Sequence, residues 1–198
     1  NHETRAAAWG DFDADGDPDL YVGFADPALP ARVYRNDQKG SRFTNVAAAI
    51  GVNLRGVARQ PAWVDYDGDG DLDLFAAFRD VANRLLRNDS GRFVDVTAAS
   101  GIGDFRKTVS AVWWDFDRDG DLDLFTANQE GEANGLYRQE RGRFTDVAVA
   151  MGVAGTPRPA ADGGVGPSGA DYDLDGDFGL FVANYGPSAL YRNEAGQS

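Results

Sequence analysis

Aspartate residues recur at alternate positions in four short segments of this 198-residue chain. Each segment has carboxylates at its first, third, fifth and seventh positions and glycine at its sixth. Three of the segments add an aspartate at the ninth position, and together they span residues 11–19, 65–73, 115–123 and 171–179. Carboxylates crowded onto a tight turn repel one another strongly unless a cation lies among them. The spacing therefore predicts a bound cation in each loop.

The number and type of these ligands select calcium among the common cations. Calcium takes about six to eight oxygen ligands, which positions one, three, five and nine and the main-chain carbonyl of position seven can supply. An EF-hand opens with the same spacing, but it requires an acid at its twelfth position and a helix on each side. The twelfth residues here are Val22, Ala76, Thr126 and Val182, and short β-type runs flank the loops in place of helices. Solvated acidic turns without a specific ion are the remaining alternative, and four near-identical copies argue against them.

The loops belong to a longer repeat. They begin 54, 50 and 56 residues apart, a period typical of propeller blades and long solenoid units. A Tyr/Leu-Arg-Asn/Gln-Asp/Glu motif follows each loop, beginning at residues 34, 86, 137 and 191. Three repeats then show Arg-Phe-Thr/Val-Asn/Asp-Val at residues 42–46, 92–96 and 143–147, whereas the fourth ends at residues 196–198, where this block is due.

These motifs require short strands to position them. Apolar runs such as residues 62–64 and 72–76 flank each acidic loop, which indicates a hairpin with the loop as its turn. The runs around Tyr34 and Phe43 indicate a second hairpin, and residues 46–50 favour a short helical turn. About four strands per repeat make one small antiparallel sheet, which must bury its faces against its neighbours. The expected fold class is all-β, a β-propeller built from four-stranded antiparallel blades with Asp-rich calcium loops.

A tryptophan two residues before the first aspartate recurs as Trp9, Trp63 and Trp113, and Gly169 replaces it in the fourth repeat. We expect these indoles to pack between blades, because a large aromatic side chain at a repeated position usually contributes to a core. An exposed platform on which a sugar ring stacks is the alternative.

The three motifs together resemble the FG-GAP/VCBS repeat family, especially the repeats that precede ASPIC/UnbV-type domains in secreted and periplasmic proteins. The likeness covers nearly the whole chain. It implies a β-propeller of the integrin-α type, usually seven-bladed, with calcium held in the loop between the first two strands of a blade. It also implies three full calcium sites and a weaker fourth, in which Gly179 replaces the last carboxylate.

The resemblance assigns the ligands residue by residue. In each site the first, third, fifth and ninth residues contribute side chains and the seventh contributes its main-chain carbonyl. The first three sites would comprise Asp11, Asp13, Asp15, Asp17 and Asp19; Asp65, Asp67, Asp69, Asp71 and Asp73; and Asp115, Asp117, Asp119, Asp121 and Asp123. The fourth would comprise Asp171, Asp173, Asp175 and Asp177.

Residues 1–198 are expected to form a single propeller region, with repeats at about 4–52, 53–103, 104–153 and 154–198, the last incomplete. Seven blades of this length need about 350 residues. The chain is therefore expected to be a fragment of a larger propeller, and a closed four-bladed ring is the alternative. The absence of an initiator methionine favours a processed or trimmed product.

Composition narrows the classes of function. The chain has 32 acidic and 19 basic residues, a net charge of −13, no cysteine and a single histidine, His2. This excludes thiol catalysis and Cys/His zinc sites, and it makes nucleic acid an improbable partner. No apolar stretch is long enough for a transmembrane segment. The four loops hold 19 of the acids, which leaves 13 acidic and 18 basic residues elsewhere. Three bound calcium ions would bring the net charge to −7.

The expected function is a calcium-stabilised interaction or scaffold module that is secreted, on the cell surface or periplasmic, with a protein or carbohydrate partner and a possible place as a subunit of a larger assembly. Residues 26–31, 55–60, 103–108 and 154–169 are the candidate partner loops, although the last is better interpreted as a plain insertion. The alternative is the propeller portion of a secreted polysaccharide lyase or phosphoesterase. No enzymatic activity is expected, because nearly all clustered carboxylates are committed to the loops.

Overall fold

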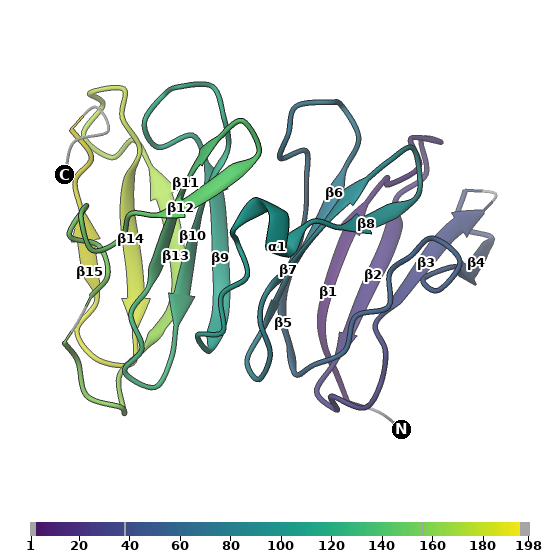
Figure 1. Ribbon diagram of the computed structural model, residues 1–198, viewed down its shortest axis with the longest axis horizontal. Helices are drawn as coiled ribbons and strands as arrows, with labels where there is room; N and C mark the ends of the chain where they lie inside the picture. Colours follow the sequence, from purple (N-terminus) through teal and green to yellow (C-terminus); the bar gives the residue numbers. More distant parts are fainter. Residues whose placement is uncertain (1–2, 38, 156, 195–198) are drawn as a thin grey trace. The chain divides into compact units, whose positions relative to one another are not determined.

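The structure is a computed structural model that describes residues 3–37, 39–155 and 157–194. These residues form four antiparallel sheets, each built from strands consecutive in the chain (Figure 1). Sheet 1 contains β1 (Thr4–Gly10), β2 (Asp19–Phe24), β3 (Arg32–Asp37) and β4 (Arg42–Asn45), and sheet 2 contains β5 (Ala58–Val64), β6 (Asp73–Phe78), β7 (Arg84–Asn88) and β8 (Phe93–Asp95). Sheet 3 contains β9 (Thr108–Trp114), β10 (Asp123–Asn128), β11 (Gly135–Glu140) and β12 (Arg143–Asp146), and sheet 4 contains β13 (Gly164–Ala170), β14 (Gly179–Asn184) and β15 (Ala189–Tyr191). The predicted all-β class and the repeated sheets are confirmed.

The acidic loops are the turns of the first hairpins. In each sheet the register places the last residue before the loop opposite the ninth loop position, as in the pairs Gly10↔Asp19 and Val64↔Asp73. Ala170↔Gly179 is the corresponding pair of sheet 4. A fixed register of this kind gives every loop the same length and the same entry and exit strands. The loop sequence can therefore adopt one conformation four times.

The second hairpin also forms as predicted. β3 pairs with β4 through Tyr34↔Asn45 and Asp37↔Arg42, and sheets 2 and 3 repeat this pairing. Sheet 4 has three strands among the described residues. Residues 196–198, where an Arg-Phe-Thr block is expected, and His2 lie outside the part of the chain that the structure describes.

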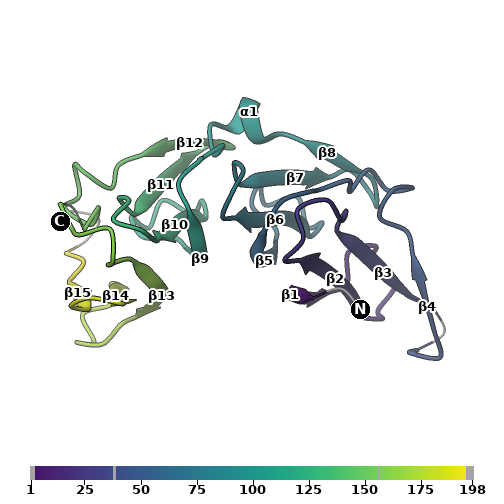
Figure 2. The ribbon, with the colours of Figure 1, turned by 90° about the horizontal axis from the view of Figure 1, so that it is seen from below.

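The chain divides into two compact units, residues 1–105 and residues 106–198. In the first, β1 adjoins β5 (Figure 2). Tyr21, Val33 and Leu74 are almost completely buried between sheets 1 and 2. In the second, β9 adjoins β13, and Phe125 and Val182 lie in the core between sheets 3 and 4. In both units the strand that enters the acidic loop is therefore the one next to the neighbouring sheet.

The repeated tryptophans take different environments. Trp63 stacks on Phe12, with ring centroids 6.0 Å apart, and its indole Nε1 donates to the Ala8 carbonyl at 3.2 Å. Gly10 accommodates this ring, because a Cβ there would lie 2.5 Å from Trp63 Cδ1. Trp9, by contrast, is 60% exposed and contacts the Phe43 ring edge-on, so core packing does not hold for it.

The predicted helical turns occupy the expected places. In the second repeat this segment is α1 (Thr97–Ser100), which ends at Gly101 with φ 85°. In the first repeat the Ile50 amide donates to the Val46 carbonyl, and in the third the Met151 amide donates to that of Val147. Among the described residues no helix has the length and hydrophobicity needed to cross a membrane.

Candidate metal sites

The four acidic loops share one backbone conformation. Their fourth residues all have positive φ, 55° at Ala14, 72° at Gly68, 62° at Arg118 and 60° at Leu174. The glycines at the sixth position have φ between 90° and 96°. Glycine adopts this left-handed region without the steric cost that other residues incur, which explains its presence in every loop. Two left-handed residues in such a short segment curl the chain so that alternate side chains converge.

Side chains inside the loop hold this curl. In the first loop, Asp11 Oδ1 accepts from the Asp15 amide at 3.1 Å, and its Oδ2 accepts from the Gly16 amide at 2.9 Å. The second and third loops repeat both bonds within 0.1 Å. The first carboxylate therefore organises the turn before any ion binds.

The carboxylate at the third loop position has the environment expected of a metal ligand. Oδ1 of Asp13 and Oδ1 of Asp117 are buried and have no hydrogen-bond partner. Burial, followed by repulsion from the fifth-position carboxylate, raises the pKa of both groups above the usual range for aspartate. A buried acceptor without a donor is costly, and a cation removes that cost. The residues present can therefore hold a cation, and their oxygen donors are consistent with calcium.

In each loop three carboxylates offer ligand atoms that lie within 4.8 Å of one another. The second and third loops bring together positions one, three and nine, whereas the first and fourth bring together positions one, three and five. The groups are Asp11, Asp13 and Asp15; Asp65, Asp67 and Asp73; Asp115, Asp117 and Asp123; and Asp171, Asp173 and Asp175. Asp19, Asp69 and Asp119 lie outside these groups, and the role of every loop aspartate as a ligand stays a prediction.

The aspartate at the ninth loop position has a structural role that the sequence pattern does not indicate. Asp19, Asp73 and Asp123 have no exposed surface. Asp73 accepts from the Tyr66 amide at 3.1 Å and from the Asn88 amide at 2.7 Å, and the equivalent bonds form in the first and third loops. This side chain thereby ties the start of the acidic loop to the third strand of its sheet.

The asparagine or glutamine of the Tyr/Leu-Arg-Asn/Gln motif completes this connection. Asn88 Nδ2 donates to the Leu72 carbonyl at 3.1 Å and to the Phe12 carbonyl, in the loop of the neighbouring repeat, at 2.8 Å. Asn36 and Gln139 likewise donate to carbonyls of their own loops. Sequence reasoning did not assign these residues a role, although their recurrence about 25 residues after each first aspartate was the available signal.

The seventh side chain points away from the ligand group. Asp17 Oδ2 accepts from the Lys39 amide at 2.9 Å, and Asp71 and Asp121 accept from the Ser90 and Arg141 amides at 3.1 Å. These bonds join the acidic loop to the turn of the second hairpin. One oxygen of each seventh side chain is thus used within the protein, and the assignment of the main-chain carbonyl of this residue to the metal stays a prediction.

The insertion in the fourth repeat is anchored to sheet 3. The Arg158 guanidinium donates through Nη2 to the Asn128 carbonyl at 2.8 Å, to Asn134 Oδ1 at 3.0 Å and to the Glu132 carbonyl. Desolvation by burial lowers the pKa of Arg158. These contacts favour a structural insertion over a partner loop for this part of residues 154–169.

Burial makes the metal-free protein sensitive to pH. It raises the pKa of Asp19 to about 6 and the pKa of Asp73 and Asp123 to about 7. An unfolded aspartate titrates near pH 4, so protonation of these groups favours folding, and this contribution is lost as pH rises through about 6 to 7. We expect metal-depleted protein to gain of the order of 2 kcal/mol per group with pKa near 7 between pH 8 and pH 5.

Calcium should reverse this trend, because protons compete with the ion for the grouped loop carboxylates, which include Asp73 and Asp123 in the second and third loops. Melting temperatures measured across this range, with and without calcium, check both signs. Parallel pH profiles in the two conditions would contradict the assignment of these carboxylates to metal loops.

Comparison with known families agrees with this geometry. The model of the FG-GAP-like repeat matches residues 11–76, 65–126 and 115–182, and each match runs from one acidic loop to the strand beyond the next. The chain belongs to the FG-GAP-like repeat family.

Among solved structures, the chain is similar to the Vibrio cholerae biofilm matrix protein Bap1, with a TM-score of 0.58 and 15% sequence identity. The alignment covers 98% of this chain and 30% of Bap1, so the chain spans less than a third of that protein. At this identity the likeness concerns the fold. A comparison with curated proteins gave no match.

Proposed function

We propose that this chain is a calcium-binding segment of a β-propeller that acts as an extracellular interaction or scaffold module. The observation that carries the proposal is the buried, unpartnered oxygen at the third position of the first and third loops, among two further carboxylates. The ions have a structural role here. Each ion offsets part of the negative charge of its loop and holds the turn of the first hairpin, so calcium stabilises the folded state by mass action.

The proposal of a larger propeller is supported by the faces of sheet 4. In sheet 3, the cross-strand pair Phe125 and Leu136 is buried against sheet 4, with 0% and 3% exposure. The equivalent pair in sheet 4, Phe181 and Leu190, is 43% and 57% exposed. A further sheet stacked on sheet 4 would bury this pair in the same way. A ring closed by four sheets is the alternative.

Secretion and a role in an extracellular matrix are proposed by analogy, because the structurally similar protein is a biofilm matrix protein. Outside the acidic loops, basic residues outnumber acidic ones by 18 to 13. Three bound calcium ions offset part of the loop charge and leave the chain at −7, so this surplus favours an anionic partner, such as an acidic polysaccharide, only at basic patches outside the loops. We propose no catalytic role, and the lyase or phosphoesterase alternative gains no support from the clustered carboxylates, which line the loops.

The proposed function predicts calcium-dependent binding to an anionic polysaccharide. Surfaces coated with hyaluronan, and with neutral dextran as the control, would be exposed to calcium-loaded and metal-depleted protein. We expect at least about tenfold more binding of the loaded protein to hyaluronan than to dextran, and loss of that binding on depletion. Equal binding to the two surfaces, or cleavage of either polysaccharide, would contradict the proposed role.

A further inference from the structure

Arg192 differs from its counterparts in the other three repeats in the acid that it contacts. Arg35, Arg87 and Arg138 pair with the acid two residues further along their own strands, at 3.0, 2.8 and 3.3 Å. Arg192 reaches into the fourth acidic loop instead. Its Nε lies 2.8 Å from Asp173 Oδ2, its Nη2 lies 3.2 Å from Asp175 Oδ2, and its Nη1 stays 3.7 Å from Glu194 Oε1.

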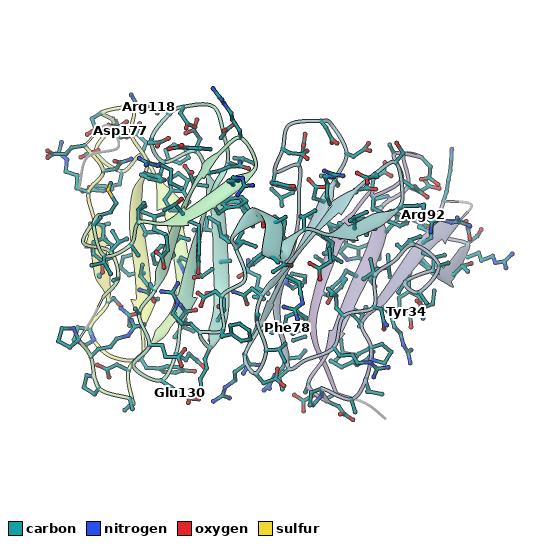
Figure 3. The ribbon with its side chains drawn as sticks, viewed as in Figure 1. Tyr34, Phe78, Arg92, Arg118, Glu130 and Asp177 are labelled. Carbon is teal, nitrogen blue, oxygen red and sulfur yellow. The ribbon has the colours of Figure 1, made fainter. Side chains whose placement is uncertain are left out.

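A second guanidinium also reaches this loop. Arg118, the fourth residue of the third loop, pairs with Asp177 Oδ1, and both side chains lie at the same end of their unit (Figure 3). In the other loops the seventh carboxylate accepts a main-chain amide of the second hairpin. Asp177 is 7% exposed, so its charge is balanced within the protein by this arginine.

The ninth position gives the reason for the difference. Gly179 carries no carboxylate, and a Cβ there would lie 2.6 Å from Tyr172 Cε1 and 3.0 Å from the Tyr191 carbonyl oxygen. Tyr172 is 47% exposed, whereas the aromatic residues at its position in the other loops are buried. The ring of Tyr172 therefore lies beside the place from which the ninth side chain would extend. The fourth loop also has a buried oxygen without a hydrogen-bond partner, Asp171 Oδ1. It differs from the other three loops in having one carboxylate fewer and two arginines paired with its carboxylates.

We propose that the fourth loop is neutralised by arginine instead of calcium, with Arg192 as the resident cation. Its planar guanidinium spans the carboxylates at loop positions three and five, a geometry that lysine could not reproduce with a single ammonium group. Calcium would have to displace Arg192 while finding one carboxylate fewer. The expected count of three calcium ions per chain rests on the proposed function. The expected effect of Arg192 on stability without calcium does not depend on that function.

The test compares the wild-type chain with Arg192→Gln and with the matched control Arg138→Gln, which loses the same group from a repeat where the guanidinium pairs with Glu140 and acts on the loop carboxylate Asp117 through its charge. Native mass spectrometry after dialysis against calcium gives the number of bound ions. We expect three for the wild type and for Arg138→Gln, and four for Arg192→Gln. In chelator we expect Arg192→Gln to melt about 4 °C or more below Arg138→Gln, because its carboxylates lose their cation.

Four ions in the wild type would overturn the proposal, as would equal melting temperatures of the two variants in chelator. If Arg192→Gln binds three ions but melts at the lower temperature, the result would support neutralisation by Arg192. The lack of a fourth ion would then be due to the missing carboxylate at Gly179. If no variant binds calcium but Arg192→Gln still melts lower, the proposed calcium function fails while the role of Arg192 stands.

Discussion

Removal of calcium is expected to lower the melting temperature of this protein by at least about 10 °C. A site at a calcium concentration of about 100 times its dissociation constant contributes about 2.7 kcal/mol to the folded state. For a unit of about 100 residues, each kcal/mol corresponds to about 4–8 °C. Residues 1–105 contain two complete loops and residues 106–198 contain one, so the first unit should lose more stability than the second.

Differential scanning calorimetry in calcium and in chelator measures this shift. Magnesium serves as the control ion, because it requires near-octahedral geometry and gives up its water reluctantly, so it should restore little of the lost stability. A melting temperature that chelation leaves unchanged would show that the loops do not depend on an ion. Full restoration by magnesium would argue against calcium selectivity.

The second large effect separates the two kinds of carboxylate within one loop. Asp19→Ala is expected to cost about 3 kcal/mol with or without calcium, because it leaves the buried amides of Phe12 and Asn36 without their acceptor. Asp13→Ala should cost a similar amount only when calcium is present. Without calcium it removes a buried oxygen that has no partner and relieves repulsion from Asp15, so its stability should equal or exceed that of the wild type.

Urea unfolding of both variants in calcium and in chelator gives the four free energies of unfolding. Unaltered far-UV circular dichroism before unfolding would establish that the variants are folded. The distinction between ligand and structural carboxylate would be wrong if Asp13→Ala were destabilised equally in both conditions. It would also be wrong if the effect of Asp19→Ala vanished in chelator.

Much of the fold could be predicted because the signals are local and repeated. The acidic loop, with its glycine at the sixth position, sits between two short apolar runs, and the structure places a hairpin there in every sheet. The second hairpin follows in the same way from the runs around Tyr34 and Phe43. Such patterns depend on neighbours in the sequence, so four copies specify them without knowledge of the tertiary structure.

The residues that escaped prediction act through contacts distant in the sequence. Asn88 joins its loop to Phe12, which lies 76 residues earlier, and this bond depends on how two sheets pack. Arg192 occupies the same motif position as Arg87 but contacts the acidic loop, which the sequence alone does not reveal. Trp9 repeats the position of Trp63 without its burial. These contacts depend on how segments distant in the sequence pack together, which the local motif does not encode.

The most direct test is a crystal structure grown in calcium, with anomalous diffraction recorded to locate the ions. We predict an anomalous peak in each of the first three loops. Each peak should mark a calcium ion bound by the carboxylates at loop positions one and three and by the main-chain carbonyl of Asp17, Asp71 or Asp121. In the fourth loop we predict the Arg192 guanidinium between Asp173 and Asp175 and no peak. Ordered water without anomalous signal in the first three loops would contradict the claim that these carboxylates bind calcium.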